Sequence, residues 1–272
     1  MPEPVTQMTD HFPLAHFERG LEGFQPPTEA FDPQGAWVNA YDIWECSQGN
    51  RRLGALRIER TPLDARRGKL EVRYRKMAAG GILRAEMSLE CKTDDLATPI
   101  RWQAQSCVHD TEDKPIEDTR LQETGEAGER ALRVKVGETP VRIPVGEPFT
   151  FDWCLFEAVQ RLSGEAVAPL EFTLIDRLNH QVKPEQRLEF RAAATVELGG
   201  KRVWREEKQP LEAGAVYRPV PAREGATATV LRAYNQTGRG IVPTVYWVDE
   251  RGRLLFALSG LIGYVLNAEA QV

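Results

Sequence analysis

Histidines and cysteines are the residues of this chain best suited to chemistry, and their spacing matches no familiar site. They are His11, His16, His109, His180, Cys46, Cys91, Cys107 and Cys154. No Cys-x-x-Cys pair occurs, and the cysteine spacings do not suit a zinc ribbon. A metal site would need carboxylates or cysteines from distant parts of the chain to join the histidines. The pattern favours surface histidines and predicts neither a metal nor a cofactor.

Catalytic motifs are missing in the same way. A nucleophile triad needs a serine or cysteine near histidine and a carboxylate, and no Gly-x-Ser-x-Gly elbow is present. The histidine–carboxylate neighbours are His109 with Asp110 and Asp176 with His180, and both pairs are typical of polar loops. We therefore predict no catalytic residue. The alternative is an unrecognised β-barrel hydrolase or isomerase, which requires His109 or His180 to meet carboxylates in a concave pocket.

Two cysteines flank a turn-rich segment, as the partners of a cross-strand disulfide would. Cys91 shares the face of Met87 and Leu89, whereas Cys107 lies opposite in parity to Trp102. If both apolar sets face the core, the thiols of Cys91 and Cys107 point to opposite sides unless a bulge intervenes. The pattern favours free thiols over a disulfide.

Alternating apolar and polar residues predict a meander of about five strands between residues 36 and 108. Leu70, Val72 and Tyr74 alternate with charged side chains, and the alternation is strict in residues 84–92. Turn-rich segments separate these strands, and each strand has one polar face. Residues 109–147 are polar and rich in glycine, with strand-like pieces only at ALRVKV and PVRIPV.

The best helix candidate covers about residues 150–162. Its apolar residues share one stripe at helical spacing, and Thr150 is a candidate N-cap. After a strand at PLEFTLID, Gly199-Gly200 suits the two-residue turn of a hairpin between residues 187–198 and 201–207. A second hairpin, residues 241–258, has apolar flanks on both faces, and the helix is the best candidate to cover its outer side.

These elements predict a mainly β protein. We expect a strongly curved antiparallel sheet or an open β-barrel with one covering helix, because the crossover helices of a parallel sheet are missing. Residues 1–35, with five prolines, are expected to form an extended N-terminal arm. Residues 36–267 are expected to form a single β-rich domain, with halves at about 36–147 and 165–267 joined through the helix.

Composition limits the classes of partner. The 272 residues are 42% hydrophobic and 28% charged, as in ordinary globular proteins, and the net charge is −5. This charge argues against nucleic acid and anionic membranes as partners, and no apolar stretch approaches a membrane span. The N-terminus lacks the features of a signal peptide. We expect either a cytoplasmic protein or a chain from which a targeting segment is missing.

The binding candidates are a set of basic and aromatic residues. The predicted ligand-binding residues are Trp102, Trp204, Tyr74, Arg73 and Arg75. Trp204 has the opposite parity to the apolar face of the predicted Gly199-Gly200 hairpin and should point towards a ligand, the helix or a partner. The basic cluster of residues 66–76 could bind an anion. A solvated sheet face paired with Glu86 and Glu90 is the favoured interpretation.

The order of elements in the second half suggests a family. A strand leads into a helix, a hairpin follows, and the chain closes on a hairpin with the pattern W-x-D-x-x-G-x-L at Trp247, Asp249, Gly252 and Leu254. Over about residues 36–267 the chain resembles a family of uncharacterised bacterial cell-envelope proteins with a long curved antiparallel sheet. The resemblance implies a curved sheet and a periplasmic or envelope location, and it brings no catalytic residues.

Three functions are compatible with these observations. The leading hypothesis is a non-enzymatic binding or scaffold protein that holds a lipid or another apolar or amphipathic ligand on the concave side of its sheet. The second is a structural or protein–protein interaction module whose apolar strands pack on a protein partner. The third is the β-barrel hydrolase or isomerase.

Overall fold

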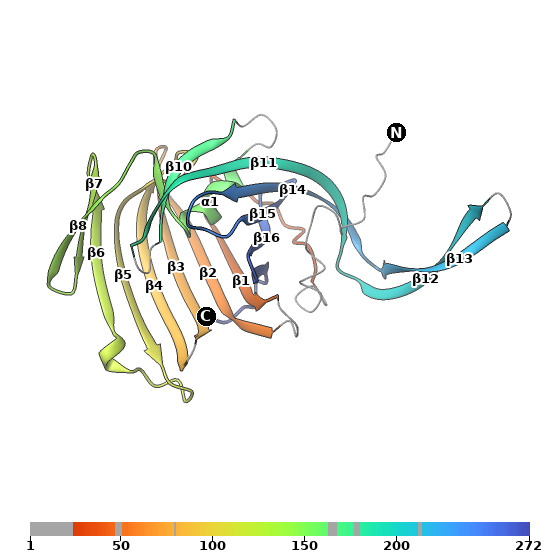
Figure 1. The fold of residues 1–272 in the computed structure, drawn as a ribbon, viewed down its shortest axis with the longest axis horizontal. Helices are drawn as coiled ribbons and strands as arrows, with labels where there is room; N and C mark the ends of the chain where they lie inside the picture. The colour runs from red at the N-terminus through yellow and green to blue at the C-terminus, as the bar shows by residue number, and fades with distance from the viewer. Residues whose placement is uncertain (1–23, 47–50, 79, 163–167, 177–179, 212–213) are drawn as a thin grey trace.

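The structure is a computed structural model that describes residues 24–46, 51–78, 80–162, 168–176, 180–211 and 214–272. For residues 201–211 and 214–223 it describes the backbone only. Fifteen strands form one sheet in the order β8-β7-β6-β5-β4-β3-β2-β1-β17-β16-β15-β14-β11-β10-β9, and β12 pairs with β13 in a separate ribbon (Figure 1).

The strands of the first half are β1 Trp37–Glu45, β2 Arg51–Asp64, β3 Arg67–Ala78, β4 Gly81–Lys92, β5 Pro99–His109, β6 Leu121–Ala127, β7 Ala131–Val136 and β8 Thr139–Pro144. A 3₁₀ turn, η2, covers Glu117–Thr119, and the helix α1 covers Cys154–Arg161. The remaining strands are β9 Phe149–Phe151, β10 Leu170–Ile175, β11 Val182–Leu198, β12 Lys201–Leu211, β13 Gly214–Glu224, β14 Thr227–Thr237, β15 Thr244–Asp249, β16 Leu254–Ser259 and β17 Ile262–Leu266.

The predicted fold class is confirmed. Over the residues that the structure describes, the protein is mainly β, with one large, curved and unclosed sheet and one α-helix. Neighbouring strands of the sheet are antiparallel except β9 and β10, which run parallel. The strands at the two free edges, β8 and β9, are close in sequence, so the chain leaves one edge of the sheet and soon joins the other.

Side-chain alternation in the meander β1–β5 gives the sheet an apolar inner face and a charged outer face. Leu70 of β3 lies opposite Leu89 of β4, which lies opposite Trp102 of β5, and all three are buried. Lys69 and Glu90, one position away, form the matching pair on the outer face. The period-two pattern of the sequence therefore corresponds to the two faces of a real sheet.

The helix α1 lies against the inner face of the curved sheet (Figure 1), and every residue from Cys154 to Gln160 is buried. Phe156 contacts the sheet through its ring. The ring is T-shaped to those of Tyr41 and Tyr264, with ring centres 5.6 Å and 5.2 Å apart. The predicted helix began too early. Thr150 belongs to strand β9 and does not cap the helix, because its hydroxyl donates to the carbonyl of Leu96 at 2.6 Å.

Polar side chains fix the helix inside the sheet. Glu157 pairs with Arg60 of β2 at 2.9 Å and with Arg161 at 2.7 Å, and all three side chains are buried. Gln160 accepts a hydrogen bond from the Asn39 amide at 2.9 Å. These groups would be costly to bury without partners, so the network ties α1 to one position in the trough.

The sequence predicted that the helix covers the outer side of the hairpin formed by β15 and β16, and this prediction is wrong. The helix covers the inner face of β15–β16, where Phe156 contacts Tyr246. On the other face of the hairpin, the ring of Phe24 lies 5.0 Å from that of Phe256, and the Arg253 guanidinium binds Glu29 at 2.9 Å. The segment before β1 therefore takes the place that the sequence assigned to the helix.

The predicted Gly199-Gly200 hairpin is also wrong. Strand β11 pairs with β14, and β12 pairs with β13, so the two glycines join consecutive strands that leave the body in one direction (Figure 1). Both glycines have positive φ angles, 74° and 71°. A positive φ serves a bend as well as a tight turn, so the local signal is the same in both cases.

Five strands escaped prediction: β13, β14 and three short ones. β6 has a mostly polar sequence, β9 has only three residues, and β17 lies in an apolar stretch without alternation. The remaining strand-like segments of the sequence, from ALRVKV to the hairpin of β15 and β16, are strands as expected. None of the described helices has the length and apolar character needed to cross a bilayer.

Candidate functional site

The predicted ligand-binding residues lie on two different faces. Tyr74 and Trp102 are buried on the inner face, whereas Arg73 and Arg75 belong to the outer face of β3. The side chain of Trp204 lies outside the described residues. The structure therefore does not bring the four described residues together, and their role in binding a ligand stays a prediction.

The concave side of the sheet is occupied where a ligand was expected. The Tyr74 ring lies 5.3 Å from that of Trp153, and the Trp102 ring lies 4.9 Å from that of Phe151. Trp153 immediately precedes α1, and Phe151 ends β9. The two aromatic residues that could have lined a hollow instead form the base on which the helix segment packs.

The two histidines that the structure describes lie near carboxylates, but not the expected ones, and His11 and His16 lie outside the described residues. The Nδ1 atom of His109 lies 3.4 Å from a carboxylate oxygen of Asp113, and the Nε2 atom of His180 lies 3.0 Å from one of Glu123. Glu123 also accepts the indole N–H of Trp102 at 2.6 Å. Both oxygens of Glu123 thus have neighbours, and this trio joins β6 to the segment before β11 across the inside of the sheet.

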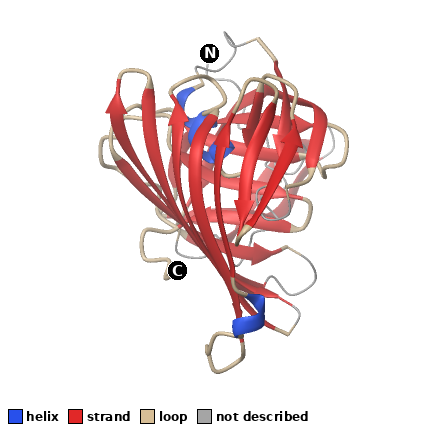
Figure 2. Ribbon diagram, turned by 90° about the vertical axis from the view of Figure 1, so that its left-hand side faces the viewer, coloured by secondary structure: helices blue, strands red, loops and turns tan. Residues whose placement is uncertain are grey.

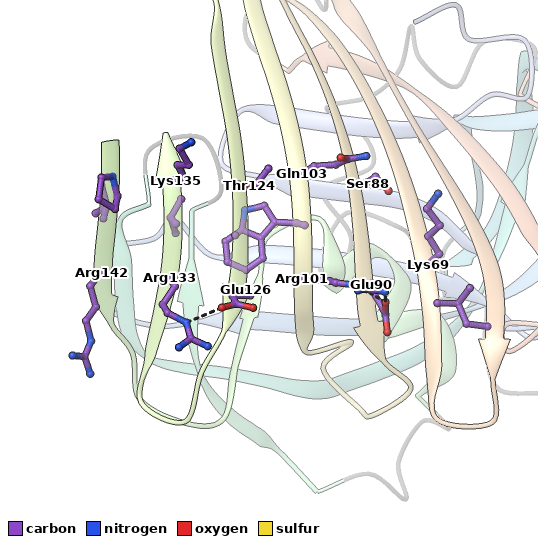
Figure 3. A pocket seen from close by; sticks show the side chains of 16 residues that line it. Lys69, Ser88, Glu90, Arg101, Gln103, Thr124, Glu126, Arg133, Lys135 and Arg142 are labelled. Carbon is purple, nitrogen blue, oxygen red and sulfur yellow. Dashed lines mark hydrogen bonds and ion pairs between the residues drawn. The ribbon is translucent and has the colours of Figure 1, made fainter. Parts of the chain in front are cut away.

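A groove of about 960 Å³ lies on strands β2–β8. We call strands β3–β8 the wing and this hollow the wing groove (Figure 3). In Figure 2 the wing faces the viewer, and its strands are twisted relative to one another. The lining residues are Leu63, Lys69, Ser88, Glu90, Arg101, Trp102, Gln103, Thr124, Gly125, Glu126, Arg133, Val134, Lys135, Pro140, Val141 and Arg142.

A row of charged side chains crosses the groove from strand to strand. Cross-strand register places Lys69, Glu90, Arg101, Glu126, Arg133 and Arg142 side by side in that order. Signs alternate along the row until its last two members, which are both arginines. Opposite charges facing each other stabilise neighbouring strands, so most of the row is built as a ladder of ion pairs.

Glu90 is the centre of the ladder. It is 8% exposed and lies between two arginines, with Arg67 at 2.7 Å and Arg101 at 2.6 Å. Desolvation opposes the charge of Glu90, but the hydrogen bonds from Arg101 and Arg67 outweigh it and lower the pKa of this carboxyl. The favoured interpretation of the basic cluster is supported here, since Lys69 faces Glu90 and Arg73 faces Glu86 across β3 and β4.

The end of the groove at β7 and β8 carries excess positive charge. Arg133 pairs with Glu126 at 2.8 Å and faces Arg142 directly across the two strands. Arg142 has no ion-pair partner among the residues that the structure describes. Like charges directly opposite each other are unfavourable, and a bound anion would relieve the repulsion.

The groove as a whole has the opposite sign to the chain. Its lining contains the five cations Lys69, Arg101, Arg133, Lys135 and Arg142, against the two anions Glu90 and Glu126, an excess of three positive charges. The whole chain has a net charge of −5. Two of these cations also pair with glutamates beside the groove, Lys69 with Glu71 and Lys135 with Glu138, so among the described residues the unpaired charge lies at Arg142. The groove can therefore attract an anionic partner at this end.

The sheet edge beside the groove is protected against strand addition. Val136 and Thr139 flank the two-residue turn between β7 and β8, so these two residues hydrogen bond to each other. Along β8 the backbone groups of successive residues point alternately towards β7 and towards the free edge. Those of Pro140, Arg142 and Pro144 point towards the free edge. Because proline has no N–H, this stretch of edge offers only the N–H of Arg142 as a donor. A partner is thus directed to the face of the wing.

Sequence reasoning missed this groove because one of its strands, β6, resembles a loop in sequence and the pairing of β7 with β8 was not predicted. Glu126 lies on β6, in a stretch interpreted as polar and rich in glycine. A signal was present at β7 and β8, where the strand-like pieces put Arg133 and Arg142 at equal distances from the turn. The pairing of two short strands was needed to bring them face to face.

The residues that carried the family resemblance have structural roles. One Asp249 carboxylate oxygen accepts the backbone N–H groups of Arg251 at 2.9 Å and Arg253 at 2.8 Å, and so closes the turn between β15 and β16. Trp247 and Leu254 are completely buried. Burial raises the pKa of Asp249 despite these hydrogen bonds.

Comparison with known proteins supports the fold. No protein-family model and no curated protein matches the sequence. Among solved structures, the chain is similar to a beta-barrel-like protein of a domain of unknown function, DUF1849, from Brucella abortus. The TM-score is 0.50 at 9% identity, covering 86% of this chain and 96% of the other. At this identity the likeness extends to the fold alone.

Proposed function

We propose that this protein is a non-enzymatic binding protein whose wing groove holds an acidic segment of a partner protein. The observation that carries the proposal is the excess of three positive charges in the groove of a chain whose net charge is −5. The unpaired Arg142 opposite Arg133 supports an anionic partner. The open, strand-crossing form of the groove suits an extended polypeptide.

The dimensions of the groove set the length of the partner segment. Strands β3–β8 are spaced about 4.8 Å apart, so the six strands span about 24 Å. An extended chain covers this distance with roughly seven or eight residues. Ser88, Gln103 and Thr124 in the middle of the groove offer hydrogen bonds to such a backbone.

A ligand on the concave side is the less supported possibility. It would have to displace α1, whose polar network and aromatic contacts hold it against the inner face. The groove needs no such rearrangement. We therefore place binding on the outer face of the sheet, and take the partner to be protein because ten of the sixteen lining residues are charged or polar.

Fluorescence polarisation with a labelled octapeptide of alternating glutamate and serine tests the proposal. We expect binding that weakens as salt is added, because the contacts are exposed ion pairs. In the double variant R133E/R142E, two attractions are replaced by two repulsions, each about 0.2–1 kcal/mol. The free energy of binding should weaken by about 0.8–4 kcal/mol, so affinity should fall at least about fourfold.

Two controls make the result specific. R191E reverses an exposed arginine on β11, outside the groove, and should bind the acidic peptide as the wild type does apart from a small change in overall charge. A peptide of alternating lysine and serine should bind more weakly than the acidic one. Equal binding of both peptides, or unchanged affinity in R133E/R142E, would contradict the proposal.

A further inference from the structure

Two cysteines that are far apart in the sequence meet inside the protein. Cys91 lies near the end of β4, and Cys154 is the first residue of α1, 63 residues later. Their sulfur atoms are 3.8 Å apart, and both residues are buried, with exposures of 3% and 0%. This is a contact between a helix and a sheet, and the alternation argument about Cys91 and Cys107 could not detect it.

The elements on either side of the two sulfurs are held together by further bonds. The hydroxyl of Thr150, just before α1, donates to the carbonyl of Leu96 at 2.6 Å. At the other end of the helix, the guanidinium of Arg161 donates to the carbonyl of Asp94 at 2.5 Å. The turn between β4 and β5 is thus attached to the helix segment at two points, which keeps the thiols of Cys91 and Cys154 side by side.

The other two cysteines differ in this respect. Cys107 contacts the hydroxyl of Thr119 at 3.6 Å, and Cys46 is buried at the end of β1. Among the described residues neither has another thiol as a contact partner. Cys46 and Cys107 are therefore natural controls for the pair.

We propose that Cys91 and Cys154 form a disulfide when the protein meets a low-molecular-weight disulfide. One protein thiolate attacks the small disulfide and releases one small thiol, and the second protein thiolate then displaces the other small thiol from the mixed disulfide. In balance, two protein thiols lose two electrons and two protons, and one small disulfide becomes two thiols. The sulfurs need to approach by about 1.8 Å, from 3.8 Å to the bond length of about 2.05 Å.

The closed structure protects the pair from rapid reaction. The hydrogen bond with Cys154 and burial raise the pKa of the Cys91 thiol well above its ordinary range, so the reactive thiolate is scarce. Oxidation therefore requires a brief opening that admits the small disulfide. Once formed, the bond fastens α1 to the wing and resists separation of the two. This inference does not rest on the groove, and its failure would leave the proposed function untouched.

The test is oxidation of the full chain with oxidised glutathione in native buffer, followed by non-reducing peptide mapping by mass spectrometry. We expect one cross-linked peptide that joins Cys91 to Cys154 and forms faster when a little urea promotes opening. Closing a loop of this length should raise the melting temperature on the order of 10 °C, reversibly with a reducing agent. C46A and C107A should keep this shift, and C91A and C154A should lose it.

Several outcomes would overturn the proposal. They are a map with only glutathione adducts, a cross-link to Cys46 or Cys107, and a Cys91–Cys154 link that forms only after complete unfolding. If C91A or C154A does not fold, the wild-type peptide map and the reversible shift in melting temperature decide the question without them.

Discussion

Replacing Glu157 by glutamine tests whether buried charges hold the helix inside the sheet. The Glu157 carboxylate accepts the Nε–H groups of Arg60 at 2.9 Å and Arg161 at 2.8 Å, and side-chain exposure is only 4% for Glu157 and 3% for Arg60. Removing one partner from a buried ion pair costs about 3–5 kcal/mol, because the other charge stays buried without compensation. We expect E157Q to lose about that much stability.

The same strand β2 supplies a matched control. Arg57 and Glu59 form an ion pair at 2.8 Å, nearly the same distance as Arg60 and Glu157, but their side chains are about one third exposed. An exposed pair contributes about 0.2–1 kcal/mol. E59Q should therefore cost no more than about 1 kcal/mol, and the contrast isolates the effect of burial.

Urea unfolding followed by far-UV circular dichroism gives both free energies by linear extrapolation, provided that the slopes agree. The double variant R60M/E157Q should recover part of the loss, because no uncompensated charge remains on Arg60. Costs for E157Q and E59Q that agree within about 0.5 kcal/mol would refute the reasoning, since differences of that size are ordinary for surface positions.

Two further predictions concern the wing. A Cβ at Gly125 would lie 2.1 Å from the buried ring of Trp102, so G125A should cost at least about 1–3 kcal/mol in urea unfolding, while G146A, whose Cβ would have only an ordinary 3.6 Å contact, should stay within about 0.5 kcal/mol of wild type. Equal effects would contradict the clash. The pKa of Glu90 is lower in the folded protein than in the unfolded chain, where it is about 4.3, so the Glu90 carboxylate stabilises the fold fully above that pH. This stabilisation is lost as the pH falls through the lower pKa of the folded state. E90Q should therefore be less stable than wild type at pH 7, with a difference that shrinks below about pH 4 in pH-dependent unfolding, and a constant difference would refute the assignment.

Much of the fold could be predicted because its signals are local. The inner face of the meander, from Leu70 to Trp102, follows from period-two alternation, which any half-buried strand must show. Little of the candidate site could be predicted in the same way. Arg133 and Arg142 acquire their significance from facing each other across two strands, and Glu126 from a strand whose mostly polar sequence resembles a loop.

The amino-acid sequence by itself indicated most of the strands, the helix of the described residues, and which side chains share a face, since these depend on neighbours within a few residues. Only the tertiary structure decided where those pieces go. Gly199 and Gly200 permit a hairpin or a bend equally well, and the pairing of β11 with β14 selects the bend. The same holds for α1, whose place inside the sheet rests on Arg60 meeting Glu157 across 97 residues of chain. Such contacts depend on free energies of burial and pairing that exist only once the distant partner has arrived.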